Sequence, residues 1–322
     1  LQREPGGDKI ITQYEMKSVE KAGILKMDFL GLRNLSILEE ALRYIKKTRD
    51  VDIVIEEIPY DDAQTFEMLG RGETVGVFQL GGSGMTHYLK ELRPTVIDDI
   101  MAMVALYRPG PMESIPEYIA RKNDPSLITF PDERLRDVLD ASYGVFTYQE
   151  DVLLTSIKMA GFSWGEADKL RKAMGKKIPA EMAKQKEKFI QGVIDNGATK
   201  SKAEEVWKLI EPFAAYGFGK AHAASYGMIA YYTAYIKAHF PGEYMAALLS
   251  CEYGDLDTVA QYVVESRKMG IPVLPPDVNE SFKLFGVIDA TTTPRIRFGL
   301  GAVKNVGEHI AEVIIETRKN GG

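Results

Sequence analysis

The sequence has little cysteine and little histidine. Its single cysteine, Cys251, excludes a disulfide framework and a cysteine-ligated zinc site, and it favours a reducing compartment. The four histidines are scattered, at His87, His222, His239 and His309, which argues against a histidine-rich metal site. The motifs of serine hydrolases (G-x-S-x-G), Walker-type nucleotide binding and zinc proteases (H-E-x-x-H) are also missing. Any catalytic chemistry must therefore come from other patterns.

Long apolar runs are missing as well. The longest uncharged, aromatic-rich run, Ala224–Ile236, is too short to span a bilayer, so we expect no membrane partner. The first residues, LQREPGGDK, are polar and hold no signal peptide. Because the chain starts without Met and ends in RKNGG, we expect an internal fragment of a longer protein.

The overall charge gives no reason to bind nucleic acid. The 322 residues are 45% hydrophobic and 27% charged, an ordinary globular composition that suggests about two domains, and the net charge is -6. Residues 169–189 differ, with eight Lys or Arg against two Glu. Such a basic run in an acidic chain is typical of a phosphate-binding surface, although a solvated helix face has the same pattern.

Apolar spacing predicts a mainly α fold with a minor α+β part. Leu35, Leu38, Leu42 and Ile45 form one helical stripe. Further helical patterns cover residues 61–70, 84–92, 96–106, 132–140, 148–160, 165–174, 180–195, 201–214, 223–239, 242–252 and 256–269. Strands are predicted over residues 23–30 and within 282–298, and the double proline at 275–276 marks a domain boundary.

Lys26 and Asp28 are the first candidate site. In a strand their side chains project from the same face, about 7 Å apart along the chain. A carboxylate that holds a divalent metal beside an ammonium that meets a phosphate suits phosphoryl transfer. A solvated strand face with a weak ion pair has the same spacing, so the pattern alone leaves both readings open.

The run from Arg171 to Lys177 is the second. Arg171 and Lys172 lie near the end of an expected helix, where the macrodipole favours cations without any ligand. With Lys176 and Lys177 nearby, these charges repel one another unless anions are close. A nucleoside triphosphate or a nucleic-acid backbone would provide such anions.

The third candidate covers residues 216–226, YGFGKAHAASY. A glycine-containing turn before a helix start can offer backbone N–H groups to phosphate. Lys220 adds a charge, His222 a neutral donor, and Tyr226, one turn later on the same face, a ring for stacking. An ordinary helix start with an aromatic core stripe remains the alternative.

Two weaker signals complete the set. Arg108 stands before Pro109 in the run YRPGP, where a stiff backbone suits either a nucleic-acid contact or a carboxylate pair. Residues 299–307, GLGAVKNVG, look like a hairpin between short helices, of the kind that holds DNA phosphate with backbone amides.

Seven runs in chain order resemble one known family. They are KMDFLGLRNLSI, VFQL followed by GM, ALYRPGP, YGVFTYQEDV, GFSWGEADKLRKAMGKK, YGFGKAHAASY and LPPDVN. Together they resemble the alpha subunits of bacterial DNA polymerase III, the C-family replicative polymerases. The resemblance implies a palm segment over 1–30, a helical fingers domain over 31–270, and over 271–322 the helix-hairpin-helix-like start of the region leading to the clamp-binding domain.

The resemblance also implies DNA-directed DNA synthesis with two Mg²⁺ ions held by three aspartates. Asp28 matches the third aspartate, as metal ligand and catalytic residue. The residues expected to contact the incoming deoxynucleoside triphosphate are Lys26, Arg171, Lys172, Lys220 and His222. Those expected to contact primer-template DNA are Arg108, Lys176, Lys177 and Tyr226. Other implied partners are the sliding clamp and further replisome subunits, in the nucleoid region of a bacterial cytoplasm.

Three departures from the family pattern matter. The run P-D-x-D-x-D-F with the other two aspartates is absent, so this piece alone is expected to be inactive. Lys172 stands where the family usually has a second arginine, and Gly81 and Gly82 stand where it usually has Glu-Ser. A non-catalytic nucleic-acid-binding module and an error-prone paralogue of the same family remain alternatives.

Overall fold

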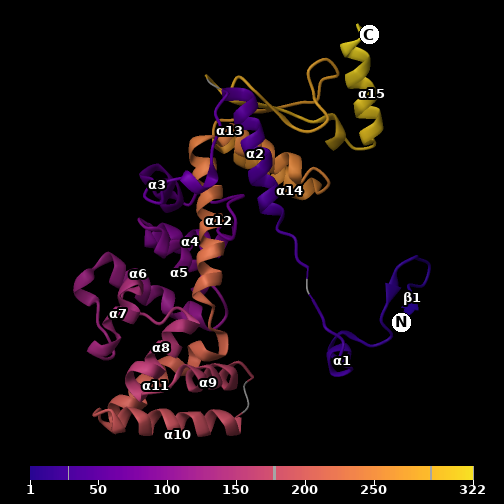
Figure 1. Cartoon of the computed structure of the whole chain (residues 1–322). Helices are drawn as coiled ribbons and strands as arrows, with labels where there is room; N and C mark the ends of the chain where they lie inside the picture. The colour runs from indigo at the N-terminus through magenta and orange to yellow at the C-terminus, as the bar shows by residue number, and fades with distance from the viewer. Residues whose placement is uncertain (28, 177–178, 291, 322) are drawn as a thin grey trace. The chain divides into compact units, whose positions relative to one another are not determined.

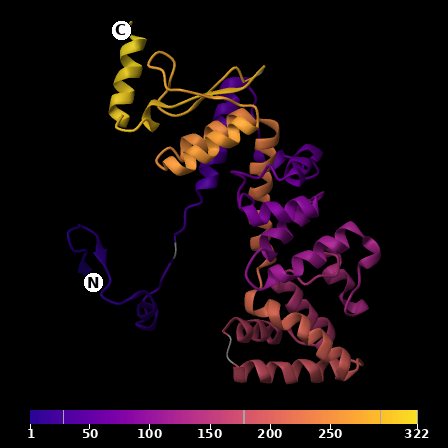
Figure 2. The same cartoon turned by 180° about the vertical axis from the view of Figure 1, so that it is seen from behind.

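The computed structural model describes residues 1–27, 29–176, 179–290 and 292–321. Within the helices it leaves out the side chains of Lys17, Pro179 and residues 174–176 and 212–216. The chain forms two compact units, residues 1–33 and residues 34–322. Figures 1 and 2 show the helices and strands from opposite sides.

The first unit is small and largely exposed. Strands β1 (Gln2–Arg3) and β2 (Ile10–Ile11) pair antiparallel, and α1 covers Met16–Lys21. The strand predicted over residues 23–30 is wrong for the described residues, since 24–27 and 29–30 have no regular structure. An isolated strand leaves its backbone groups unpaired and its apolar face in water. Phe29 is 90% exposed, so the apolar face that the strand would have is not buried.

The second unit is mainly helical, which confirms the expected fold class. Its helices in the first half are α2 (Arg33–Arg49, whose first residue closes the first unit), α3 (Ala63–Arg71), α4 (Ser83–Leu92), α5 (Ile97–Leu106), α6 (Ile115–Asn123), α7 (Arg136–Leu139) and α8 (Gln149–Ala160). Those in the second half are α9 (Trp164–Lys176), α10 (Pro179–Asp195), α11 (Lys200–Tyr216), α12 (Lys220–His239), α13 (Pro241–Cys251), α14 (Leu256–Lys268) and α15 (Glu308–Lys319).

Helix α12 is the central helix of this unit. It packs along α5 and α3, as both figures show. Buried residues occur all around it, among them Ala223, Ala230, Tyr231 and Ile236, which is typical of a helix surrounded by others. Gly227 lets α5 approach, since a Cβ there would lie 2.6 Å from Cγ of Met101.

Helices α8, α9, α10 and α11 pack together (Figure 1). They include a separate aromatic cluster with Phe162, in the turn between α8 and α9. The ring centroids of Phe189 and Trp207 lie 5.5 Å apart, and those of Phe162 and Phe189 lie 6.4 Å apart. Trp207 and Phe189 are fully buried. Phe162 lies two residues before the start of α9, the helix that carries the first half of the basic run.

The last part holds a small sheet of order β3-β5-β4. Strand β3 (Val273–Leu274) runs parallel to β5 (Arg295–Arg297), and β4 (Gly286–Ile288) pairs with β5 antiparallel. Val273 and Val287 both pair in register with Ile296, which is fully buried. The short strands predicted within residues 282–298 are therefore confirmed.

The helices differ from the expectation at several places, and α1 and α15 lie outside the predicted helical ranges. The helix predicted over residues 132–140 divides into 3-10 turns around a single α-helical turn, α7. Helix α6 also lies outside the predicted helical ranges, and Pro116 lies in its first turn. Proline is tolerated in the first turn of a helix, where its missing N–H has no partner to lose.

Candidate nucleotide and nucleic-acid interface

The start of α12 is held in place by the start of α8. Tyr148 and Phe218 form a parallel bridge, and the Gln149 backbone N–H donates to the Phe218 carbonyl over 3.0 Å. The Gln149 side-chain amide donates to the Gly217 carbonyl over 2.7 Å. Phe218 is only 7% exposed, so its ring serves as a fixed platform for the residues around it.

Four rings and one guanidinium form a continuous column on this platform. Cζ of Arg108 lies 3.8 Å from the Phe218 ring centroid, and the Phe218 and His222 centroids lie 4.8 Å apart. The His222 and Tyr226 rings follow at 4.3 Å, and Tyr226 contacts Phe78 at 5.2 Å. We call these five residues the aromatic column. It joins three segments distant in the sequence and confirms that His222 and Tyr226 share a face.

Arg108 is held without a carboxylate. Its guanidinium is half-buried, and among the described residues it makes no hydrogen bond or ion pair. Burial lowers the pKa of Arg108 from its ordinary value, but arginine stays charged in proteins. A stacked, charged guanidinium whose N–H groups lack a partner in this part of the chain can donate hydrogen bonds to a phosphate or to a base edge.

Lys220 lies beside the column. Its ammonium nitrogen lies 5.5 Å from the Tyr148 ring centroid, and its side chain is exposed. Its backbone N–H donates to Oε2 of Glu150 over 2.7 Å. A carboxylate thus takes the first backbone N–H of α12, so that group is not offered to phosphate as the sequence suggested. The side chains of Lys220 and His222 remain exposed for a ligand.

Asp151 is the buried acid next to this site. It accepts hydrogen bonds from the backbone N–H groups of Thr147 and Tyr148, over 2.9 and 2.8 Å. Burial raises the pKa of Asp151 to about 6, against the opposing effect of these hydrogen bonds and of Lys220. The Asp151 carboxyl therefore becomes negatively charged as the pH rises through about 6, and this charge interacts with the Lys220 ammonium.

The basic pair on α9 shares one acid. Arg171 reaches Oδ1 of Asp168 over 2.7 Å, and Lys172 reaches Oδ2 over 2.7 Å. Lys172 and then Arg171 hold the pKa of Asp168 below its usual range. The three residues keep one net positive charge, so the pair is less repulsive than the sequence suggested. Both side chains are partly exposed on one face of α9.

Four predicted residues stand outside this arrangement. Asp28 and Lys177 lie outside the described residues, and Lys176 is described only as the last residue of α9. Lys26 is half-buried in the first unit. No group of three or more His, Cys, Asp or Glu in the described ranges could hold a metal ion. No helix in those ranges is both long enough and apolar enough to span a bilayer.

Sequence reasoning missed Phe218 and Phe78 as site residues. Phe218 lies between Gly217 and Gly219 just before a helix start. This pattern indicates a turn whose backbone fixes the position of the Phe218 ring. Phe78 gave no such signal, because its contact with Tyr226 spans 148 positions of the chain.

Two family models match the chain. The model of the bacterial DNA polymerase III alpha subunit finger domain matches residues 34–197, and a helix-hairpin-helix motif matches residues 270–322. The second match covers the glycine-rich hairpin predicted at residues 299–307.

Three curated relatives are each named DNA polymerase III subunit alpha. The protein from Thermus aquaticus is 48% identical over 327 residues, which cover 100% of this chain and 26% of that protein. The protein from Mycobacterium leprae is 46% identical, covering 100% of this chain and 28% of its own length. The one from Aquifex aeolicus is 44% identical, covering 97% and 27%.

The chain thus spans about a quarter of the length of these relatives. The finger-domain match extends over half of the chain, and the relatives match it almost from end to end. These comparisons confirm the resemblance seen in the seven sequence runs. The chain belongs to the family of bacterial DNA polymerase III alpha subunits.

Proposed function

We propose that this chain is the nucleotide- and DNA-binding part of a DNA-directed DNA polymerase, which adds deoxynucleotides to a primer 3′-OH. One observation carries the proposal. Arg108, Lys220, His222 and Tyr226, each selected from the sequence, gather at the start of α12. Cations beside stacked rings suit a ligand that combines phosphates with bases.

The residues divide by the part of the substrate they suit. Phosphoryl transfer depends on positioning and on offsetting the charge of the triphosphate. The cations proposed for the incoming triphosphate are Lys26, Arg171, Lys172 and Lys220, with His222 as a neutral donor. Those proposed for the primer-template are Arg108, Lys176 and Lys177, with Tyr226 as a stacking ring.

The proposed cofactor is Mg²⁺, with Asp28 as one ligand. The described residues do not fit a complete two-ion site, because none of them form a cluster of three donors. In the complete subunit, further carboxylates would have to join Asp28, and this piece alone is expected to be inactive.

We propose the domain limits and partners in line with this role. Residues 1–30 belong to the palm, 31–270 to the fingers, and 271–322 to the start of the region leading to the clamp-binding domain. The partners are primer-template DNA, deoxynucleoside triphosphates, the sliding clamp and other replisome subunits. The place of action is the nucleoid region of the bacterial cytoplasm.

The test is primer extension by the complete subunit with magnesium and four deoxynucleotides. Wild type should extend the primer, and Asp28→Asn should lose activity by far more than tenfold while binding primer-template normally, since only the metal ligand changes. Asp8→Asn, an exposed aspartate of the same unit, is the matched control and should stay active.

Survival of Asp28→Asn within about tenfold of wild type would refute the metal-ligand role. Inactivity of the wild type with DNA binding retained would instead favour a non-catalytic binding module, which the helix-hairpin-helix match also allows. An error-prone paralogue would show itself by extension past damaged template bases.

A further inference from the structure

One surface residue has an uncommon backbone conformation. Gln79 has φ 60°, in the left-handed region that favours glycine. It belongs to the loop of residues 73–82 between α3 and α4, which we call the α3–α4 loop. A side chain other than glycine persists in this region only where its surroundings enforce it, and such residues gather at functional sites.

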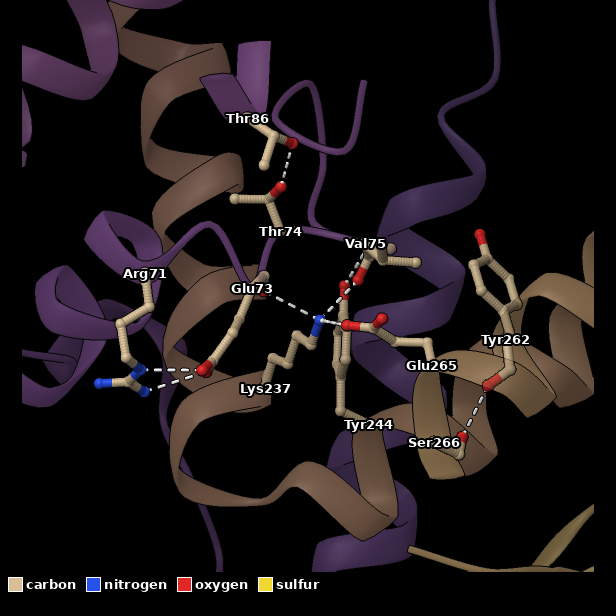
Figure 3. Close-up of polar contacts among 11 residues, drawn as sticks. Arg71, Glu73, Thr74, Val75, Thr86, Lys237, Tyr244, Tyr262, Glu265 and Ser266 are labelled. Carbon is tan, nitrogen blue, oxygen red and sulfur yellow. Dashed lines mark hydrogen bonds and ion pairs between the residues drawn. The ribbon is translucent and has the colours of Figure 1, made fainter. Parts of the chain in front are cut away.

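The surroundings do enforce this loop. The Lys237 ammonium donates to the carbonyls of Glu73 and Val75, over 2.9 and 2.8 Å, and to Oε1 of Glu265 over 3.0 Å. Figure 3 shows these contacts converging on the Lys237 nitrogen. Tyr244 donates to the carbonyl of Gly76 over 2.7 Å. Three carbonyl groups of the loop are thus fixed by side chains of α12 and α13.

Two more contacts fix the rest of the loop. The Phe78 backbone N–H donates to Oγ1 of Thr233 over 3.1 Å. The hydroxyl oxygens of Thr74 and Thr86 lie 2.6 Å apart, which ties the loop to α4 (Figure 3). With its backbone held at both sides, Gln79 cannot relax to a right-handed conformation without breaking buried hydrogen bonds.

The loop places the residue before Gln79 in the aromatic column. That residue, Phe78, packs on Tyr226, the last ring of the α12 face. A few residues later, Gly84 lies under Tyr107, since a Cβ there would be 2.1 Å from the Tyr107 hydroxyl oxygen. Tyr107 precedes Arg108, the cation of the column. The segments on both sides of Gln79 therefore touch the column or the residue next to it.

The Gln79 side chain is exposed and makes no hydrogen bond to the described part of the chain. Its carboxamide is neutral and both donates and accepts. The cations at the other end of the column, Arg108 and Lys220, suit phosphates, so a neutral amide adds a contact of another kind, to a base edge. The minor-groove acceptors, N3 of purines and O2 of pyrimidines, are common to all four base pairs.

From this geometry we infer that the Gln79 carboxamide donates a hydrogen bond to a minor-groove acceptor of the nascent base pair. The inference rests on the proposed polymerase function and adds a specificity-determining contact to it. A contact common to all correct pairs supports incorporation of each nucleotide without selecting a template sequence.

Replacement by glycine separates the two roles of this residue. Gln79→Gly removes the carboxamide but supplies the residue that the backbone conformation favours. In the complete subunit, we expect an unchanged or higher Tm together with a fall of about tenfold in kcat/KM for correct nucleotide incorporation. Gln79→Asn, which tolerates the conformation but is one methylene shorter, should lose activity as well.

A substrate analogue identifies the acceptor. 3-Deaza-dGTP replaces the N3 acceptor by C–H, so it should slow the wild type but have little further effect on Gln79→Gly. Asp50→Gly is the matched control, because Asp50 is also exposed and left-handed, with φ 53°, and lies in the connection after α2. It should keep full activity.

Each other outcome overturns the inference. Full activity of Gln79→Gly, with wild type active, would mean that the carboxamide has no ligand. An equal analogue effect in wild type and Gln79→Gly would exclude the N3 contact. A wild type that does not extend the primer at all would overturn the proposed function, and this inference with it.

Discussion

Asp151 is a buried acid beside the proposed site, and burial raises its pKa. Its folded-state pKa of about 6 lies above the ordinary value of 3.8, so the folded chain binds the proton more tightly than the unfolded chain. This linkage stabilises the fold below about pH 4, and the contribution is lost as the pH rises through about 6. About two pKa units correspond to a free energy on the order of 3 kcal/mol.

We therefore predict that Asp151→Asn becomes more stable relative to wild type as the pH rises from 4 to 7.5. The amide keeps an acceptor for the N–H groups of Thr147 and Tyr148 but does not titrate. Thermal unfolding of both proteins across this range is the measurement. A constant difference in Tm would show that Asp151 has an ordinary pKa.

At this scale, sequence reasoning identified residues that neighbour one another along the chain. His222 and Tyr226 were predicted to share a face because their spacing is one helical turn, and their rings do meet. The ion pairs of Arg171 and Lys172 with Asp168 follow the same local rule and could have been anticipated. The Arg108 contact with Phe218 could not, since nothing local joins these positions.

Among the elements, the contact between α12 and α5 sets the position of the column. At Gly227, one residue after Tyr226, an added Cβ would lie 2.6 Å from Cγ and 3.3 Å from Cα of Met101. The Cα atom cannot move without moving α5, so the close approach depends on the missing side chain.

Gly227→Ala should therefore destabilise the protein by about 1–3 kcal/mol, although alanine is the better helix former. Gly165→Ala in α9 is the matched control, because an added Cβ there meets no atom within 4 Å. It should leave Tm unchanged or raise it. Equal thermal stability of the two variants would contradict the close packing of α12 on α5.

Most helices were predictable as elements, because their apolar stripes repeat with the helical period. Helix α12 was predicted although buried residues occur all around it, since its apolar pattern is long and free of proline. The strand predicted over residues 23–30 is wrong for the described residues, because alternating apolar residues indicate only which face a strand would bury. The alternation does not specify the neighbouring strand that the backbone groups would need, and no strand pairs with the described residues of 23–30.

At the scale of the whole chain, the second unit assembles the aromatic column from distant segments. Phe78, Arg108 and Phe218 lie in three segments, and α12 with its neighbours α5 and α8 brings them together. The family and the fold class could be predicted from sequence runs in order. The column could not, because it depends on how α12 packs against the rest of the second unit.

On the proposed function, the aromatic column binds the primer-template or the incoming nucleotide. The most direct measurement is primer-template binding by the complete subunit carrying Arg108→Ala, with Arg136→Ala as control. Cζ of Arg136 also lies over a phenylalanine ring, 4.5 Å from the ring centroid of Phe130. Within the described residues, and unlike Arg108, Arg136 forms an ion pair, with Glu133.

We predict that Arg108→Ala weakens binding by about tenfold with little change in Tm, because its charge has no carboxylate partner in the described chain. Arg136→Ala should bind as wild type does. Equal affinity of the Arg108 and Arg136 variants would contradict the account and leave the column as a structural contact.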